Sequence, residues 1–222
     1  MSEPVVLQWS GGKDSALALE ALTSDPGADV VGLLVSHSDA DDRVTMHGVR
    51  RELVDAQAQA LGQPLVPMTL PTGASNAGYE ARLREALSDV MDRGISTVAT
   101  GDVFLDDVRQ YREDRLGEIG MALWTPLWGE DSATLVGRFA DAGFKAVTVC
   151  VSAEHLDARF LGQPLDRTFL DRLPPGIDPC GEHGEHHSFV YDGPRFAWPI
   201  DVRLGEIVSS NGHWYQDLIP GA

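Results

Sequence analysis

The segment Ser-Gly-Gly-Lys-Asp-Ser at residues 10–15 directly follows an apolar run at residues 4–9. A β-branched run that ends in a Gly-Gly turn and opens a helix is suited to holding an anion, because glycines let a ligand approach the backbone. The first N–H groups of the helix lack partners within it, and the helix dipole favours negative charge. Ser10, Lys13 and Ser15 add two hydroxyls and a cation at the same point. This segment therefore predicts a strand, an anion-binding loop and a helix.

The loop is not a Walker loop, which needs four residues between its first glycine and the Gly-Lys-Ser/Thr sequence. An ordinary glycine-rich turn is the alternative interpretation, and the complete six-residue motif favours the anion site over it. The chain has only two lysines, Lys13 and Lys145. Because lysine is a compact point charge, Lys13 is suited to a phosphate, and we expect an exposed loop side chain there.

The composition predicts a globular protein without a membrane anchor. The chain has 222 residues, 43% of them hydrophobic, and fits one α/β domain or one domain plus a small appendix. No apolar run approaches the ~20 residues needed to span a bilayer, and no signal peptide is recognisable. Two cysteines, Cys150 and Cys180, do not form a disulfide framework, so we expect a cytoplasmic protein.

The chain is strongly acidic, with a formal net charge of −17 and a pI near 4.6. Nucleic-acid binding depends largely on neutralising phosphates, so this charge counts against a nucleic-acid partner. Solubility explains the acidity more simply than a functional cause does.

The order of the predicted elements indicates an α/β fold. Apolar runs predict strands over residues 4–9, 29–36, 65–70, 96–100 and 145–151. Apolar residues at helical spacing predict helices over residues 14–23, 48–61, 76–93, 107–120 and 132–142. Strands that alternate with helices form a parallel sheet with helices on both faces, and ligands bind at the carboxyl ends of such strands.

The pattern changes after about residue 152, and six prolines between residues 164 and 199 interrupt it. The tail from Ser188 indicates strands, and Asn211-Gly212 is a strong hairpin signal between two of them. We therefore predict a nucleotide-binding domain over residues 1–152 and a smaller, partly β C-terminal region over residues 153–222.

Four segments together carry a resemblance to a known family, and they read SGGKDS, MHGVRRELVDAQAQALGQPL, GDVFLDDVRQYREDRLGEIGMALWTPLWGED and DPCGEHGEHHSFVYDGPRF. The first alone is similar to the pyrophosphate-binding (PP) loop of the N-type ATP pyrophosphatases, which have a HUP/Rossmann-like fold. All four, in this order between about residues 5 and 200, resemble the diphthine–ammonia ligase family. The Gly-Glu-x-Gly-Glu segment at residues 181–185 is its most specific part. Tail domains of eukaryotic members are absent, so we expect a bacterial-type member.

The resemblance implies an ATP-dependent amide ligase. A carboxylate would attack the α-phosphorus of ATP, pyrophosphate would leave, and ammonia would displace AMP from the acyl-adenylate. The implied partners are ATP with Mg²⁺, ammonia and a carboxylate-bearing acceptor, which is a small molecule or a protein. The C-terminal region would bind this acceptor. The identity of the acceptor, the source of ammonia and a homo-oligomeric state stay open.

The PP loop supplies the first set of candidate residues. The β- and γ-phosphates would lie on the backbone and side chains of Ser10, Gly11, Gly12, Lys13, Asp14 and Ser15. Lys13 would act in catalysis by stabilising charge on the leaving pyrophosphate. Asp14 would either cap the helix or hold Mg²⁺, and both alternatives stay open.

A second set of candidates follows predicted strands. Ser36 and His37 would meet adenosine, and His47 would lie near the phosphates. Gly101 and Asp102 would approach the α-phosphate or the acceptor, and we assign Asp102 a catalytic role. The alternatives are ordinary loop histidines and a simple helix cap at Gly101-Asp102.

A third set serves the acceptor half of the reaction. Glu182 and Glu185 would hold ammonium or take a proton from it, and surface charge is the alternative. Zinc binding is disfavoured at a neighbouring cluster that consists of Cys180, His183, His186 and His187. A solvated ion-pair face is preferred over an arginine on the acceptor or phosphate for Arg109, Arg112 and Arg115.

Two other functions compete with the ligase. An ATP sensor would bind the nucleotide without turning it over. A PP-loop enzyme that modifies nucleic acid is disfavoured by the acidity of the chain and by the lack of a Cys-x-x-Cys motif or a basic appendix.

Overall fold

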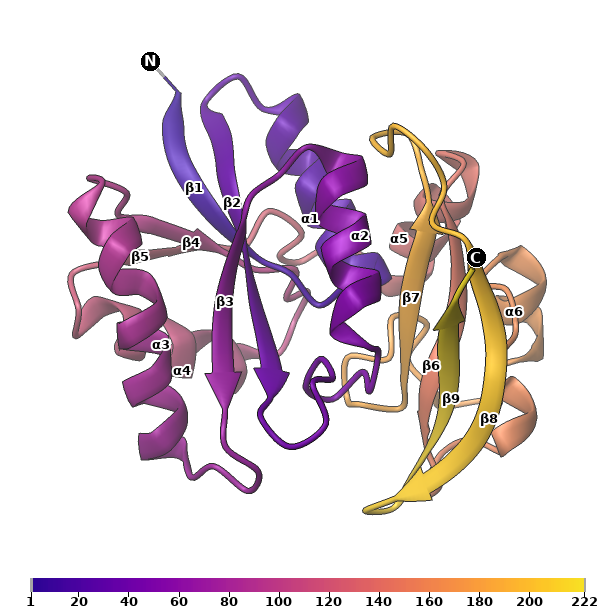
Figure 1. Cartoon of the computed structure of the whole chain (residues 1–222). Coiled ribbons are helices and arrows are strands. Elements are labelled where there is room, and N and C mark those ends of the chain that lie inside the picture. Colours follow the sequence, from indigo (N-terminus) through magenta and orange to yellow (C-terminus); the bar gives the residue numbers. More distant parts are fainter. Residues whose placement is uncertain (1, 222) are drawn as a thin grey trace.

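The first sheet carries the PP loop at the end of its central strand. In the computed structural model, which describes residues 2–221, five parallel strands lie in the order β3-β2-β1-β4-β5 (Figure 1). Their bounds are Glu3–Gln8 for β1, Ala28–Ser38 for β2, Leu65–Leu70 for β3, Thr97–Ala99 for β4 and Ala122–Trp124 for β5. The order reverses between β1 and β4, which is where open α/β sheets bind ligands.

Helices cover both faces of this sheet because alternate residues of each strand face opposite sides. Val5 and Leu7 of β1 pack with α1 and α2, whereas Val6 packs with α3 and α4. The helix bounds are Lys13–Ser24 for α1, Arg51–Leu61 for α2, Asn76–Asp92 for α3 and Asp106–Gly117 for α4. The predicted α/β class with helices on both faces is confirmed.

The C-terminal part forms a second, antiparallel sheet in the order β7-β6-β9-β8. Its strands span Lys145–Ser152 (β6), His186–Asp192 (β7), Val202–Ser210 (β8) and His213–Pro220 (β9). Three short helices flank it, at Ser132–Asp141 (α5), Ala158–Phe160 (η1) and Arg167–Arg172 (α6). The predicted hairpin is present, and both turn residues, Asn211 and Gly212, have the positive φ that such a turn requires.

One predicted strand belongs to a different sheet from the one expected. Residues 145–151 form a strand as predicted, but β6 pairs antiparallel with β7 and β9 instead of joining the parallel sheet. The fifth parallel strand is β5, whose three residues are too few for a periodic signal. The division at residue 152 stays a prediction, and its two end residues, 1 and 222, lie outside the described residues.

Helices α1 and α2 lie between the two sheets (Figure 1). Gln57 of α2 is fully buried there, and its Oε1 accepts a hydrogen bond from Trp9 Nε1 at 2.9 Å. Its Nε2 donates to the carbonyl oxygens of Gly11 at 3.0 Å and Val190 at 2.6 Å. One amide therefore joins the PP loop to both sheets.

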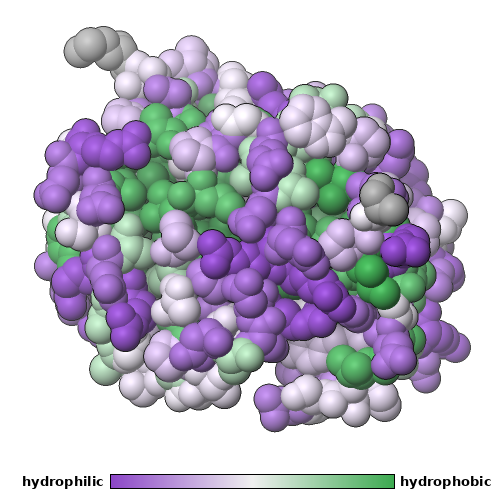
Figure 2. All heavy atoms as spheres, in the orientation of Figure 1, coloured by the Kyte–Doolittle hydropathy of each residue, from purple (hydrophilic) through white to green (hydrophobic). Residues whose placement is uncertain are grey.

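Hydrophilic residues cover most of the middle of the face shown in Figure 2, and hydrophobic residues are visible to the left and to the right of them. No helix within residues 2–221 is long and apolar enough to cross a membrane.

We expect Gln57→Leu to lower the free energy of unfolding by about 2–4 kcal/mol, because it removes three buried hydrogen bonds and leaves the Trp9 indole N–H without its acceptor. Urea denaturation measures the change. Gln59→Leu is the matched control, because Gln59 lies on the same helix with an exposed side chain. Equal stability of the two variants would contradict a structural role for the Gln57 amide.

Candidate active site

The PP loop depends on two close backbone approaches. Gly11 has a φ of +79°, and a Cβ there would lie 2.7 Å from Gln57 Oε1. A Cβ on Gly12 would lie 2.9 Å from His47 Cε1. The Ser15 hydroxyl donates to the Gly12 carbonyl at 2.9 Å, and no side chain caps α1. The N-cap residue Gly12 has no side chain that could cap these N-terminal amides, and Ser188 Oγ of the C-terminal part accepts from only one of them, that of Lys13.

Lys13 does not project from the loop as predicted. Its side chain is only 2% exposed, and Nζ donates to Asp14 Oδ2 at 2.8 Å and to the Cys180 carbonyl. Its backbone N–H donates to Ser188 Oγ at 3.1 Å. Burial is the largest single effect and lowers the pKa of Lys13, but the charge and hydrogen bond of Asp14 together with the neighbouring Cys180 and Glu182 raise it above its usual value. The lysine therefore stays charged and ties the loop to the segment before β7.

A polar cavity of about 300 Å³ opens beside the loop at the carboxyl edge of the first sheet. Most of the predicted site residues meet here although they come from four separate segments. The cavity lining includes Ser10, Asp14, Ser15, Ser36, His47, Gly101, Asp102, Glu182 and His187.

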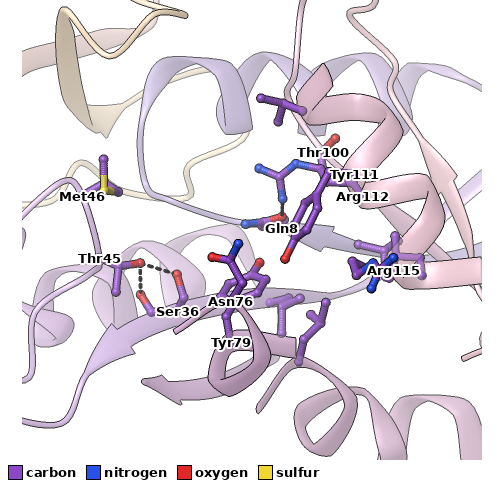
Figure 3. Close-up of a pocket in the computed structure, with 15 residues that line it drawn as sticks. Gln8, Ser36, Thr45, Met46, Asn76, Tyr79, Thr100, Tyr111, Arg112 and Arg115 are labelled. Carbon is purple, nitrogen blue, oxygen red and sulfur yellow. Dashed lines mark hydrogen bonds between the residues drawn. The ribbon is translucent and has the colours of Figure 1, made fainter. Parts of the chain in front are cut away.

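A second cavity of about 440 Å³ adjoins the first between α3 and α4 (Figure 3). Its floor is apolar, Tyr79 and Tyr111 enter it, and none of the described residues that line it is acidic. Gln8, Ser36, Thr45 and further residues line both cavities. The two cavities therefore form a continuous site with a polar end and an aromatic end.

Arg112 stands where the two cavities meet. Its Nε lies 2.9 Å from Asp102 Oδ2, and its Nη1 donates to Gln8 Oε1 at 2.6 Å (Figure 3). Asp102 also accepts a hydrogen bond from Thr100 at 2.8 Å. Arg109 differs, because it pairs with Glu113 at 2.8 Å on the helix surface. Arg115 lines only the second cavity.

Glu182 lines the polar cavity, and its Oε2 accepts a hydrogen bond from the Val103 amide at 3.1 Å. Burial, followed by the charge of Asp14, raises the pKa of Glu182 to about 7. A carboxyl group in a cleft with a pKa near neutrality is suited to accept and release protons.

Glu185 lines neither cavity. It is 3% exposed, and its two oxygens accept hydrogen bonds from the Asp178 and His183 amides at 3.1 Å and 3.0 Å. These contacts shape the loop that presents Glu182, so the geometry favours a positioning role over the predicted catalytic one.

Two other predicted groups lie away from the cavities. The His37 ring is 3% exposed, and its Nε2 lies 3.0 Å from Thr69 Oγ1, so its imidazole does not line either cavity. Cys180 is buried, and burial raises its pKa to about 12. Among residues 2–221, no group of three or more His, Cys, Asp and Glu is placed to hold a metal ion.

Other site residues have weaker sequence signals. Tyr79 belongs to the periodic apolar stripe of α3, so the pattern indicates a core residue. No local motif marks Gln8, Tyr111 or Gln57. His187 had a signal only as one of several clustered histidines.

Comparison with known proteins shows the family to which the chain belongs. The sequence-family model of the diphthamide synthase N-terminal domain matches residues 3–123, and that of the C-terminal domain matches residues 131–218. The chain belongs to the diphthamide synthase family. Diphthine–ammonia ligases of Bos taurus and Danio rerio are each 27% identical over 90% of this chain, and the alignments cover 83% and 86% of those proteins. The Homo sapiens protein of that name is 26% identical over 90% of the chain and 82% of its own length.

These matches confirm the predicted family and the predicted enzyme class, an ATP-dependent carbon–nitrogen ligase. The N-terminal family model ends within β5, and the C-terminal one begins at the N-cap of α5. The two matches therefore correspond to the two sheets.

We expect Lys13→Met to lower the free energy of unfolding by about 1–3 kcal/mol, because it removes the donor from Asp14 and from a buried carbonyl. Chemical denaturation measures the change. Lys145→Met is the control, because the exposed Lys145 pairs only with Asp192 and should have no measurable effect. A Lys13→Met variant as stable as the parent would show that the buried ion pair contributes nothing.

Proposed function

We propose that this ligase binds ATP across both cavities, adenylates a carboxylate and transfers ammonia to it, with release of AMP and pyrophosphate. The observation that carries the proposal is the continuous site, in which an anion-binding loop opens toward an aromatic, apolar cavity. One ligand that carries a polyphosphate and an aromatic base fits both ends.

The aromatic cavity suits adenosine. Purine rings stack on aromatic side chains, and Tyr79 and Tyr111 stand over an apolar floor of Leu34, Leu83 and Val98. Ser36 lines both cavities, in agreement with its predicted place at adenosine. The triphosphate would extend from there to residues 10–15.

Adenylation would take place near Arg112, where the cavities meet. An acceptor carboxylate oxygen would bond to the α-phosphorus while the bond from that phosphorus to the oxygen of the leaving pyrophosphate breaks. The loop amides are suited to the charge on pyrophosphate. Arg112 would orient the carboxylate or the α-phosphate, and Asp102 would hold Arg112 in place. Lys13 would act indirectly, by fixing the loop.

Ammonia would then attack the carbonyl carbon of the acyl-adenylate, and the bond to AMP would break. The nitrogen must lose a proton in this step, and Glu182 is the carboxylate in the cavity with a pKa suited to take it. The acceptor, a small molecule or a protein, is defined here only by its carboxylate.

The residues present fit a magnesium ion. Asp14 Oδ1 is buried without a hydrogen-bond partner, although the same carboxylate pairs with Lys13 through Oδ2. Mg²⁺ binds oxygen ligands and needs only one or two carboxylates beside substrate phosphates. Asp14 would hold the ion, which would neutralise charge on the phosphates.

We expect the chain to catalyse carboxylate-dependent exchange of labelled pyrophosphate into ATP, and to form AMP rather than ADP with ammonium and pooled carboxylates. Asn76→Trp should fill the mouth of the aromatic cavity and weaken ATP binding at least about tenfold by calorimetry. Ala77→Trp is the matched control, because this exposed neighbour does not line the cavity. ADP as the sole product would overturn the mechanism, and binding without turnover would identify a sensor.

We expect amide formation to rise with pH through about 7, because only the ionised Glu182 can accept a proton. Glu182→Gln should remove this step and lower the rate by roughly 10²-fold, with ATP affinity within a few-fold of the parent. Rate profiles between pH 5.5 and 8.5 test this, with the exposed Glu154→Gln as the control. A pH step that persists in Glu182→Gln would assign the base to another group.

A further inference from the structure

The polar cavity has an unfavourable charge balance for a triphosphate. The described charged residues that line it are Asp14, Asp102, Glu182 and Arg112, and Arg112 is already paired with Asp102. Lys13, the cation of the loop, is buried and points at Asp14 and Cys180. The amides and one metal ion offset only part of the charge of ATP. Another source of positive charge is needed at the pyrophosphate end.

Two imidazoles stand at this end. The rings of His47 and His187 both line the polar cavity, with centroids 4.6 Å apart and a tilt of 33°. His47 lies against the PP loop, because its Cε1 would be 2.9 Å from a Cβ on Gly12.

Both rings have a nitrogen available for a ligand. His47 Nδ1 lies 3.2 Å from the Ser188 carbonyl oxygen, which only accepts, so Nδ1 carries the proton and Nε2 is the basic nitrogen. His187 Nε2 is buried without any hydrogen-bond partner. A buried nitrogen without a partner is costly unless a ligand satisfies it.

The surroundings keep both rings neutral before a ligand binds. Burial, with a contribution from Lys13, lowers the pKa of His47 to about 4, and burial followed by His47 lowers that of His187 well below its usual value. Lys13 on α1, His186 on β7 and His213 on β9 act on His187 through their charge, and Lys13 also acts on His47. The other charged groups that line the same cavity are Asp14, Asp102, Arg112 and Glu182.

We infer that nucleotide binding draws a proton onto the His47–His187 pair, and that the protonated pair then donates to the pyrophosphate end of ATP. This inference rests on the proposed function. Phosphate oxygens beside the rings favour the charged imidazole, which reverses the effect of burial. One proton is expected, because a second charge on the adjacent ring would be repelled. This proton supplies the positive charge that Lys13 does not offer to the phosphates, because Lys13 is paired with Asp14.

The test is calorimetric titration of the full chain with α,β-methylene ATP and excess Mg²⁺, at pH 6.5, in buffers with different enthalpies of ionisation. Net uptake of up to one proton is expected in the parent, together with an affinity that rises as the pH falls from 8 to 6. His47→Gln and His187→Gln should each lose the uptake and bind about tenfold more weakly at pH 6.5, as for one charge-assisted hydrogen bond.

Two controls separate the sources of the proton. Glu182→Gln should keep the uptake, whereas uptake lost only in Glu182→Gln would overturn the inference. His155→Gln, at an exposed histidine outside the cavity, should match the parent. The Cε1–H resonances of His47 and His187 should together shift by the amount expected for one protonated imidazole on addition of nucleotide, a change that a merely structural role would not produce.

Binding without proton uptake would overturn this inference and leave the proposed function standing. Failure of the parent to bind the nucleotide at all would overturn both.

Discussion

The contact between the PP loop and β7 determines the rest of the site. The Val190 amide donates to the Gly11 carbonyl at 2.8 Å, and Ser188 Oγ accepts from the Lys13 amide at 3.1 Å. Gln57 joins the same two segments through carbonyl oxygens on each. A loop at the end of one sheet is thus fixed by an edge strand of the other. The geometry of the anion site therefore depends on the packing of the two sheets.

This arrangement explains why the titratable groups of the site come from both parts of the chain. Asp14 and Asp102 follow strands of the parallel sheet, whereas Glu182 and His187 precede or begin β7. Glu185 holds the turn between them by accepting two amides. Because both amides would lose their acceptor, replacing the Glu185 carboxylate would disturb the position of Glu182 without removing a contact to a ligand.

Local patterns predicted the parts of the fold that depend on local forces. The strand, loop and helix around residues 10–15 and the hairpin at Asn211-Gly212 follow from glycine conformations and apolar periodicity. Sheet membership of β6 depends on distant partners, so its apolar run could not distinguish a parallel from an antiparallel place. β5 pairs through three residues and leaves no periodic signal.

In the candidate site, too, local motifs predicted some residues, whereas others depend on distant contacts. Motif position identified Asp14, Asp102 and Glu182, which all line the polar cavity. The direction of a side chain is set by packing, and no pattern could show that Lys13 turns inward to the Cys180 carbonyl. The same holds for Gln57, whose role depends on a contact with Val190, more than a hundred residues away.

Burial has opposite effects on the acidic and basic groups of this cleft. It raises the pKa of Glu182 to about 7 and lowers that of His47 to about 4, so both groups move toward their neutral forms. Lys13 escapes this effect because Asp14, bonded to it, and the other acidic groups around it together raise its pKa. A cleft that removes charge from its own side chains is more responsive to the charge of a substrate, since screening by water is weak there. The proton positions in this site are therefore set largely by the ligand, and the fold supplies the geometry in which the ligand sets them.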